Sequence, residues 1–147
     1  MTNLNTTHCM RKIATLTVFA MPMWVLVLVG CSTIVGADFV QRYNQNPLTV
    51  GIPPGLSPQD VEEAMVLTLS SRGWTVAQRS PQEVVGQLDH RNFQGKITLK
   101  ANGLIKILSE SYFKHESGSL EPGVPKGWLR NIRKDLAARL ASKAEQR

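Results

Sequence analysis

Few residues in this chain have the side chains and spacing that catalysis or metal binding needs. His90 and His115 lie in the second half of the chain, and with Glu110 they could supply three ligands to a metal ion. No pair of them has the helical spacing typical of a zinc site. His90 adjoins Asp89, but neighbours on a strand point to opposite faces, so these two do not form a catalytic pair. We therefore expect no metal site.

The serines and glycines give no stronger sign of an enzyme. Ser109 and Ser111 lack the Gly-x-Ser-x-Gly context of a nucleophile elbow. No glycine-rich loop is spaced to cradle a phosphate. We expect a protein without catalytic residues or cofactor. A hydrolase is the alternative, and it would need a cleft that joins His90 or His115 to an acid.

Cys31 ends the only long apolar run in the chain. Residues 1–12 carry two positive charges and no acid, and residues 13–29 are apolar apart from two threonines. Gly30 supplies a small residue just before the cysteine. This order is typical of a secretory signal. The alternative is a retained transmembrane helix, but seventeen residues reach only the lower limit for crossing a bilayer, and Pro22 interrupts them.

The four residues Leu28-Val29-Gly30-Cys31 resemble the lipobox of bacterial lipoproteins. The resemblance covers residues 1–31, with translation starting at Met1 or at Met10. It implies a diacylglyceryl thioether on Cys31, cleavage after Gly30, and acylation of the new amino group by a chain such as palmitate. In the Gram-negative members of this family, Asp after the cysteine favours the inner membrane. Ser32 therefore implies the outer membrane, on the periplasmic side, with the inner membrane as the alternative.

Length and charge limit what the processed chain could be. The 147 residues carry a net charge of +6. Removal of residues 1–30 leaves about 117 residues, enough for one domain, with 15 basic and 11 acidic side chains and a net charge of +4. Cys31 would be the sole remaining cysteine, which excludes an internal disulfide and a cysteine-based zinc site. The positive charge favours anionic neighbours. We expect no nucleic-acid partner, since surface aromatics are not interleaved with the cations.

Residues 31–47 are predicted to form a lipidated tether, followed by a single domain over residues 48–147. Residues 32–47 show no sustained hydrophobic period. Sixteen residues fully extended would reach roughly 55 Å from the bilayer. Docking of Phe39, Val40 or Tyr43 onto the domain would shorten that reach.

The domain itself has clear helix and strand signals. Ser57-Pro58 is a typical helix start, and Gly73 a typical helix end, followed by Trp74, which could fold back onto the core. A glycine- and proline-rich loop is predicted over residues 116–125, and a closing helix from Pro125 to about Ala144. The predicted strands cover residues 48–52, 74–79, 83–91, 93–101 and 104–113.

Asn102-Gly103 predicts a hairpin, and its loop length sets the register. A two-residue loop pairs Leu99 with Lys106 and puts a cation among apolar side chains. A three-residue loop pairs Leu99 with Ile105, and a shift of one residue would reverse the faces. We prefer the three-residue loop because it gathers four aliphatic side chains on one face: Ile97, Leu99, Ile105 and Ile107.

The predicted fold is α+β: a small antiparallel sheet of about four to five strands, packed on one face by two helices in the order β-α-β-β-β-β-α. The opposite face would then be basic. Its candidate residues for an anionic ligand are Arg91, Lys96, Lys100 and Lys106. The closing helix is also basic on one side and could lie on anionic lipid. We favour a core-facing role for it, because the core needs its apolar stripe.

The chain resembles one group of small uncharacterised bacterial lipoproteins in its element order and in two tripeptides, Arg72-Gly73-Trp74 and Ser109-Glu110-Ser111. This resemblance covers most of residues 48–140 and adds support for the fold only. We expect a lipid-anchored envelope protein that binds or supports a partner without catalysis, with the membrane reached through Cys31. The alternative is a cationic module for an anionic envelope polymer, lipopolysaccharide or peptidoglycan.

Overall fold

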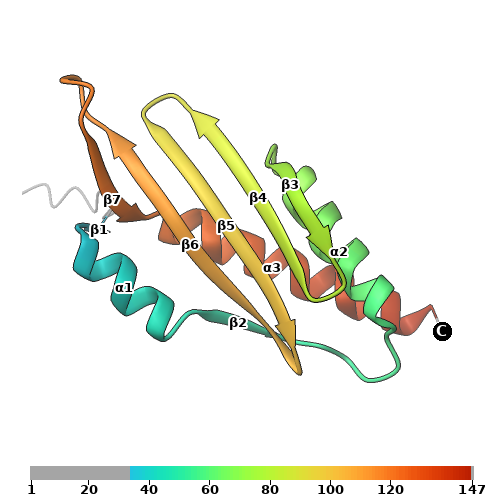
Figure 1. Cartoon of the computed structure of the whole chain (residues 1–147). Helices are drawn as coiled ribbons and strands as arrows, with labels where there is room; N and C mark the ends of the chain where they lie inside the picture. Colours follow the sequence, from blue (N-terminus) through green and yellow to red (C-terminus); the bar gives the residue numbers. More distant parts are fainter. Residues whose placement is uncertain (1–33, 147) are drawn as a thin grey trace, which may run out of the picture.

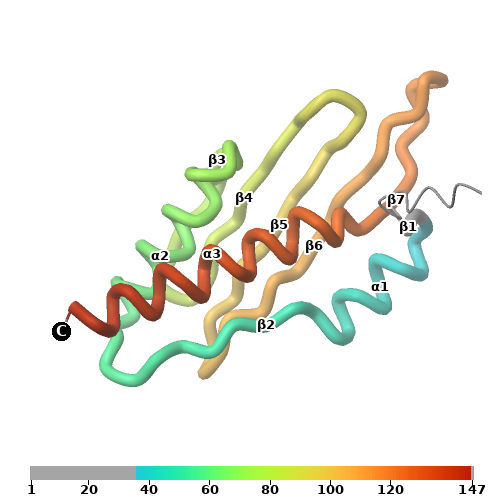
Figure 2. Tube along the Cα trace, turned by 180° about the vertical axis from the view of Figure 1, so that it is seen from behind, coloured from blue at the N-terminus to red at the C-terminus, as the bar shows by residue number. Residues whose placement is uncertain are grey.

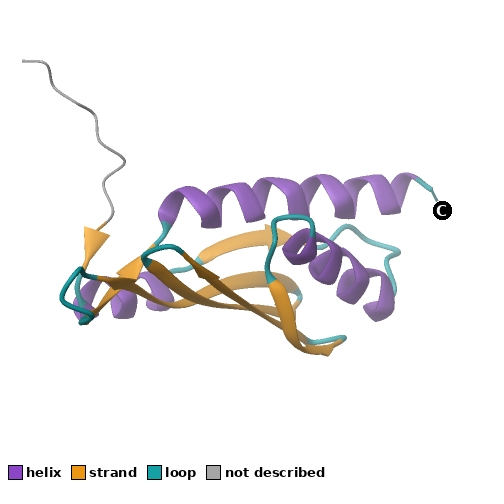
Figure 3. Cartoon of the chain, turned by 90° about the horizontal axis from the view of Figure 1, so that it is seen from above, coloured by secondary structure: helices purple, strands orange, loops and turns teal. Residues whose placement is uncertain are grey.

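The computed structural model describes residues 34–146 and has the predicted α+β fold (Figure 1). Two helices of this fold, α2 and α3, lie together on one face of an antiparallel sheet (Figure 3). The elements in chain order are β1 (Ile34–Val35), α1 (Ala37–Gln45), β2 (Leu48–Gly51), α2 (Pro58–Ser70), β3 (Thr75–Ser80), β4 (Glu83–His90), β5 (Phe93–Asn102), β6 (Leu104–Lys114), β7 (Leu120–Val124) and α3 (Lys126–Glu145).

The sheet has seven strands in the described part of the chain, in the spatial order β1-β7-β6-β5-β4-β3, with β2 also paired to β6. Strands β3 to β6 form a meander of successive antiparallel neighbours. Helix α2 carries the chain from β2, beside β6, across to β3 at the opposite edge (Figures 1 and 2). Helices α2 and α3 cover different parts of the same sheet face.

Helix α2 has the termini that its sequence predicts. The Ser57 hydroxyl accepts a hydrogen bond from the Asp60 amide at 3.2 Å, and the Asp60 carboxylate accepts one from the Ser57 amide at 2.8 Å, which completes a capping box. Gly73 ends the last turn at φ +77°, a left-handed conformation that favours glycine. The helix is fixed at both ends and buries its apolar stripe on the sheet.

The core forms where α2 and α3 meet the sheet. Ile97 and Leu99 are fully buried, as the predicted faces require. The predicted stripe of α3 is also buried, and its residues are Leu129, Ile132, Leu136 and Leu140. The predicted closing helix is thus confirmed, with its apolar side used by the core.

The predicted hairpin register is wrong by two residues, although the predicted faces are correct. Leu99 pairs with Ile107, and Ile97 with Ser109. The turn is centred on Gly103 at φ +67°, with Asn102 opposite Leu104, because glycine accepts the left-handed conformation that the turn centre needs. A shift of two preserves the alternation of side chains, so the aliphatic residues stay on the core face.

Two segments predicted to lack regular structure are ordered. Residues 37–45 of the predicted tether form α1, and residues 120–124 of the predicted loop form β7, so both local predictions are wrong. Helix α1 has no fully buried residue, and among its apolar side chains only Val40 and Tyr43 are partly buried against the core. Strand β7 contains Pro122 but gains partners on both sides, from β6 and from β1. In both cases long-range contacts outweigh weak local signals.

Helix α1 completes the outer edge of β6. Strand β2 pairs with β6 through residue 107, and β7 pairs with it from residue 112, which leaves a gap around Ser109. The Asn44 side-chain amide fills this gap: its nitrogen donates to the Ser109 carbonyl and its oxygen accepts from the Ser109 amide, both at 3.0 Å. The Tyr43 hydroxyl donates to the Ile107 carbonyl at 2.6 Å. Side chains of α1 therefore take the place of a strand.

An aromatic cluster closes the core at the β4–β5 end. Trp74 is buried and packs edge-on against Trp128, with ring centroids 6.2 Å apart, and Phe93 packs against Trp128 at 4.6 Å. Gly95 makes room for them, since a Cβ there would lie 2.8 Å from the Trp74 ring and 2.5 Å from Phe93. The expectation that Trp74 folds back onto the core is confirmed, and the partly buried Trp128 packs against it.

Candidate functional site

One face of the sheet is left uncovered, because α2 and α3 both pack on the other (Figure 3). Figure 1 views the molecule from this uncovered face, with the two helices behind the strands. Cross-strand register decides which side chains project from it: Val84 faces Leu99 in the core, so their chain neighbours point the other way. The side chains of the uncovered face include Thr75, Glu83, Gln87, Asp89, Gln94, Lys96, Thr98, Lys100, Lys106, Leu108, Glu110 and Tyr112.

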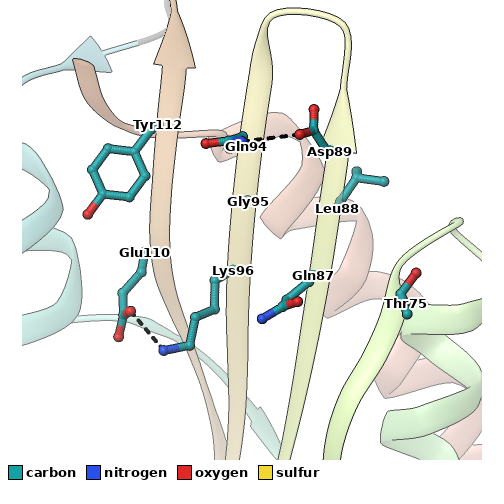
Figure 4. A pocket seen from close by; sticks show the side chains of 9 residues that line it. All are labelled: Thr75, Gln87, Leu88, Asp89, Gln94, Gly95, Lys96, Glu110 and Tyr112. Carbon is teal, nitrogen blue, oxygen red and sulfur yellow. Dashed lines mark hydrogen bonds and ion pairs between the residues drawn. The ribbon is translucent and has the colours of Figure 1, made fainter. Parts of the chain in front are cut away.

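The uncovered face is hollowed by a shallow, open pocket of about 500 Å³ (Figure 4). It lies across β3, β4, β5 and β6, which hold it on a rigid surface rather than on loops. Its lining combines carboxamides, an ion pair and one aromatic ring. The residues are Thr75, Gln87, Leu88, Asp89, Gln94, Gly95, Lys96, Glu110 and Tyr112.

Hydrogen bonds hold the polar groups of the pocket in place. The Gln94 side-chain nitrogen donates to Asp89 at 3.1 Å, and Lys96 Nζ donates to Glu110 at 2.9 Å (Figure 4). Tyr112 is 41% exposed, a high fraction for an aromatic side chain on a sheet. Positioned amides beside an exposed aromatic ring can bind a polar ligand by hydrogen bonds and stacking.

Charges on the uncovered face are largely neutralised in pairs. Lys100 lies 3.2 Å from Glu83, and Lys114 lies 3.0 Å from Asp89. Hydrogen bonds from Gln94 and then from Lys114 hold the pKa of Asp89 below its usual value. Exposed ion pairs of this kind add little stability. Their main consequence is that the face carries mixed charge rather than a strong positive field.

The structure brings only part of the predicted anionic-ligand set together. Lys96, Lys100 and Lys106 share the uncovered face, and Lys106 lies directly opposite Lys100. Arg91 lies in the β4–β5 turn, at the other end of β5 from Lys100 and Lys106, about 30 Å away at the rise of a strand. The four cations therefore do not form one continuous patch.

The three residues considered as metal ligands lie against different partners. His90 packs against the Trp128 ring with centroids 6.3 Å apart, and the His115 ring lies 2.9 Å from the Glu121 carboxylate. Glu110 is paired with Lys96 on the uncovered face. Within residues 34–146, no three histidine, cysteine or acidic side chains cluster as a metal site would require.

Ser109 and Ser111 lie on the core face rather than in the pocket. Both are buried, and their hydroxyls are 2.9 Å apart. This mutual hydrogen bond satisfies two polar groups beneath the helices. Neither hydroxyl has a histidine as a hydrogen-bond partner in the described structure, so their geometry is that of a buried structural pair.

The sequence alone assigned none of four residues of the pocket to a site: Gln87, Asp89, Gln94 and Tyr112. The available signal was the alternation of side chains along a strand. Tyr112 is an even number of residues from Lys106 and Glu110, so all three side chains lie on the same face of β6. Alternation could not predict that β3 to β6 place these side chains around one pocket.

The Cys31 prediction falls outside the described residues, as do the rest of the lipobox and the secretory signal. Among the residues that the structure does describe, no helix has the length and hydropathy needed to cross a membrane.

Comparison with protein-family models, with curated proteins and with solved structures finds no significant match to this chain.

Proposed function

We propose that this chain is a lipid-anchored, non-catalytic binding module of the bacterial envelope, with the uncovered sheet face as its binding surface. The anchor is the lipid on Cys31, supported by the resemblance of Leu28-Val29-Gly30-Cys31 to a lipobox. Ser32 in place of Asp favours the periplasmic side of the outer membrane. The inner membrane is the alternative location.

The observation that carries the binding role is the pocket on the uncovered face. A sheet with helices on one side only exposes its other side to solvent, and here that side holds a hollow of about 500 Å³ lined by Gln87, Gln94 and Tyr112. Its groups hydrogen-bond and stack, and they include no nucleophile with an adjacent base. These features support binding without chemistry.

The pairing of the lysines favours a polar partner over a strongly anionic one. Lys96 and Lys100 each lie within salt-bridge distance of a carboxylate, so little free positive charge remains beside the pocket. We therefore favour a protein partner that presents polar groups. The alternative, an anionic envelope polymer, rests on Lys106, which faces Lys100 across the hairpin and would be relieved of repulsion by a bound anion.

Photo-crosslinking in intact cells tests the binding surface. A photoreactive residue at Gln87, an exposed pocket position, is compared with one at Ala138, an exposed position on α3. We expect a discrete protease-sensitive adduct from position 87 that is absent from position 138. The same adducts from both positions, or none from position 87, would contradict the proposal.

Salt and a second variant separate the two partner classes. Binding of an anionic polymer should weaken as salt rises, because exposed charges are screened beyond about 8 Å at physiological ionic strength. Binding of a polar protein partner should survive added salt and should be lost in Tyr112→Ala. An adduct that resists protease and disappears with salt would select the polymer.

A further inference from the structure

The anchor proposed above brings one end of the domain close to the bilayer, and the present inference rests on that anchor. Cys31 precedes Ile34, the first described residue, by three positions. Three residues fully extended span at most about 11 Å. A lipid on Cys31 would therefore hold β1 near the headgroups, far closer than a free tether of residues 31–47 would.

Strand β1 lies at the N-terminal end of α3. Ile34 pairs with Val124, which precedes Lys126, the first residue of the helix, by two positions. Both β1 and the start of α3 lie at this end of the molecule in the two ribbon views (Figures 1 and 3). The bilayer would thus meet the first turns of α3.

These turns carry a dense group of cations, which we call the cationic flank. At 100° per residue they occupy a sector of about 100° around the helix. All are exposed, and none is in a salt bridge within the described structure. The residues are Lys126, Arg130, Arg133 and Lys134.

The cationic flank points away from α2. Trp128 and Asp135 lie roughly opposite to it on the helix. Trp128 packs on Trp74, which follows α2, and Asp135 accepts a hydrogen bond from Arg72 at 2.6 Å. The flank therefore faces outward and toward the edge of the sheet that carries β1 and α1.

Residues 126–134 of α3 contain no acidic side chain, and Asp135, which follows Lys134, is paired with Arg72. The first turn holds no acidic residue, although the N-terminal end of a helix favours negative charge. Lys143 of the same helix differs, because it pairs with Glu63 at 2.7 Å. An anionic surface would neutralise the flank and also suit the helix dipole.

We propose that the cationic flank lies against anionic phospholipid headgroups of the bilayer that holds Cys31. The contact is electrostatic, since the apolar stripe of α3 is buried in the core and cannot insert. Because the flank faces the β1–α1 edge of the sheet and not its uncovered face, this orientation leaves the uncovered face clear of the bilayer and open to a partner (Figure 3).

The full chain, lipidated in cells and reconstituted into vesicles, tests this orientation. Lipidation consumes the Cys31 thiol, so a fluorophore can be attached to one new cysteine, either Arg133→Cys on the flank or Lys106→Cys on the uncovered face. Both variants remove one exposed cation. Vesicles contain about one third phosphatidylglycerol in phosphatidylcholine, with a headgroup-linked quencher, or phosphatidylcholine alone with the same quencher.

We expect strong quenching at position 133 in the anionic vesicles, loss of it at high salt or in phosphatidylcholine alone, and little quenching at position 106. Reversing Lys126, Arg130 and Lys134 to Glu should abolish quenching at position 133 while the lipid stays on Cys31. Equal quenching at both positions, or no response to charge reversal, overturns the orientation. Absence of lipid from Cys31 instead overturns the anchor, and with it this inference. An unchanged circular dichroism spectrum shows that each variant remains folded.

Discussion

At the scale of single residues, the Asn44 carboxamide makes the hydrogen bonds to β6 that a neighbouring strand would otherwise make. The Asn44 side chain offers a donor and an acceptor in the arrangement of a peptide group, and so it pairs with both backbone groups of Ser109. The two residues are 65 positions apart. No local pattern around Asn44 could reveal this role, because it depends on the gap between β2 and β7.

Replacing Asn44 with Ala should destabilise the fold by about 2 kcal/mol, because a partly buried donor and acceptor lose their partners. Asn44→Asp should also be destabilising, since a carboxylate cannot donate to the Ser109 carbonyl. Urea unfolding measures both losses. The control is Gln45→Ala, an exposed neighbour on the same helix, whose effect should stay within about 0.5 kcal/mol. Equal effects of Asn44→Ala and Gln45→Ala would contradict the role of Asn44.

Gly95→Ala should destabilise by about 1–3 kcal/mol, the usual range for overpacking a core. The new methyl group would lie 2.8 Å from the Trp74 ring and 2.5 Å from Phe93, and both rings are buried. The matched control is Gly127→Ala, where a Cβ meets nothing within 4 Å and helix propensity favours alanine. Thermal unfolding should show a lower midpoint for the first variant and an unchanged or higher midpoint for the second. A shift of the same sign and size in both would show that the rings can move aside.

At the scale of elements, the sequence predicts those whose signals are local. Helix α2 has a capping box and a terminal glycine, α3 has a full apolar stripe, and β5 and β6 alternate clearly. Helix α1 and strand β7 could not be predicted in this way. The first buries no residue fully and the second contains Pro122, so each depends on neighbours from distant parts of the chain.

The same division applies to the candidate site. The alternation of β4, β5 and β6 assigns Gln87, Lys96 and Lys106 to one face, and the structure agrees. Ion pairing of Lys96 with Glu110 follows from cross-strand register, which the loop length alone did not fix. The sequence could therefore predict a face, but not its charge balance or its pocket.

The docking of α1 should weaken at high pH through Tyr43. Burial raises the pKa of its hydroxyl from 10.0 to about 12, only partly offset by a backbone hydrogen bond. The unfolded chain therefore loses this proton first, and the contribution of Tyr43 to stability falls as pH rises from about 10 to about 12. Tyrosinate absorbance should show one of the two tyrosines titrating late, and Tyr43→Phe should remove that late phase. A single phase near 10 in the native chain would contradict the burial of the Tyr43 hydroxyl.

At the scale of the whole molecule, the domain begins before residue 48. Strand β1 and helix α1 pack on β7 and β6, and β1 starts three positions after Cys31 in the sequence. If the proposed lipid on Cys31 anchors the chain, a domain held this close has limited freedom to turn relative to it. The proposed role of the uncovered face therefore depends on orientation as well as on its side chains.

Replacing Cys31 with Ala should block processing and release the protein from membranes, since the lipid is the proposed anchor. Single acyl chains bind bilayers only marginally, whereas two or three hold stably. Fractionation of cells and fatty-acid labelling measure the two effects. Cys9→Ala, within the proposed signal, is the control and should change neither. A Cys31→Ala variant that still takes up the label would show that the lipidation site is elsewhere.

The closed outer edge of β6 has a further consequence, for the behaviour of the protein at high concentration. An unpaired strand edge is a template on which other chains add as strands and aggregate. Here β2, Asn44 and β7 together occupy the longest strand of the sheet along its outer side. At the opposite end, β3 is interrupted by a bulge between Val76 and Gln78, which disfavours regular pairing with a second chain. At high concentration we therefore expect these molecules to lie side by side without joining their sheets.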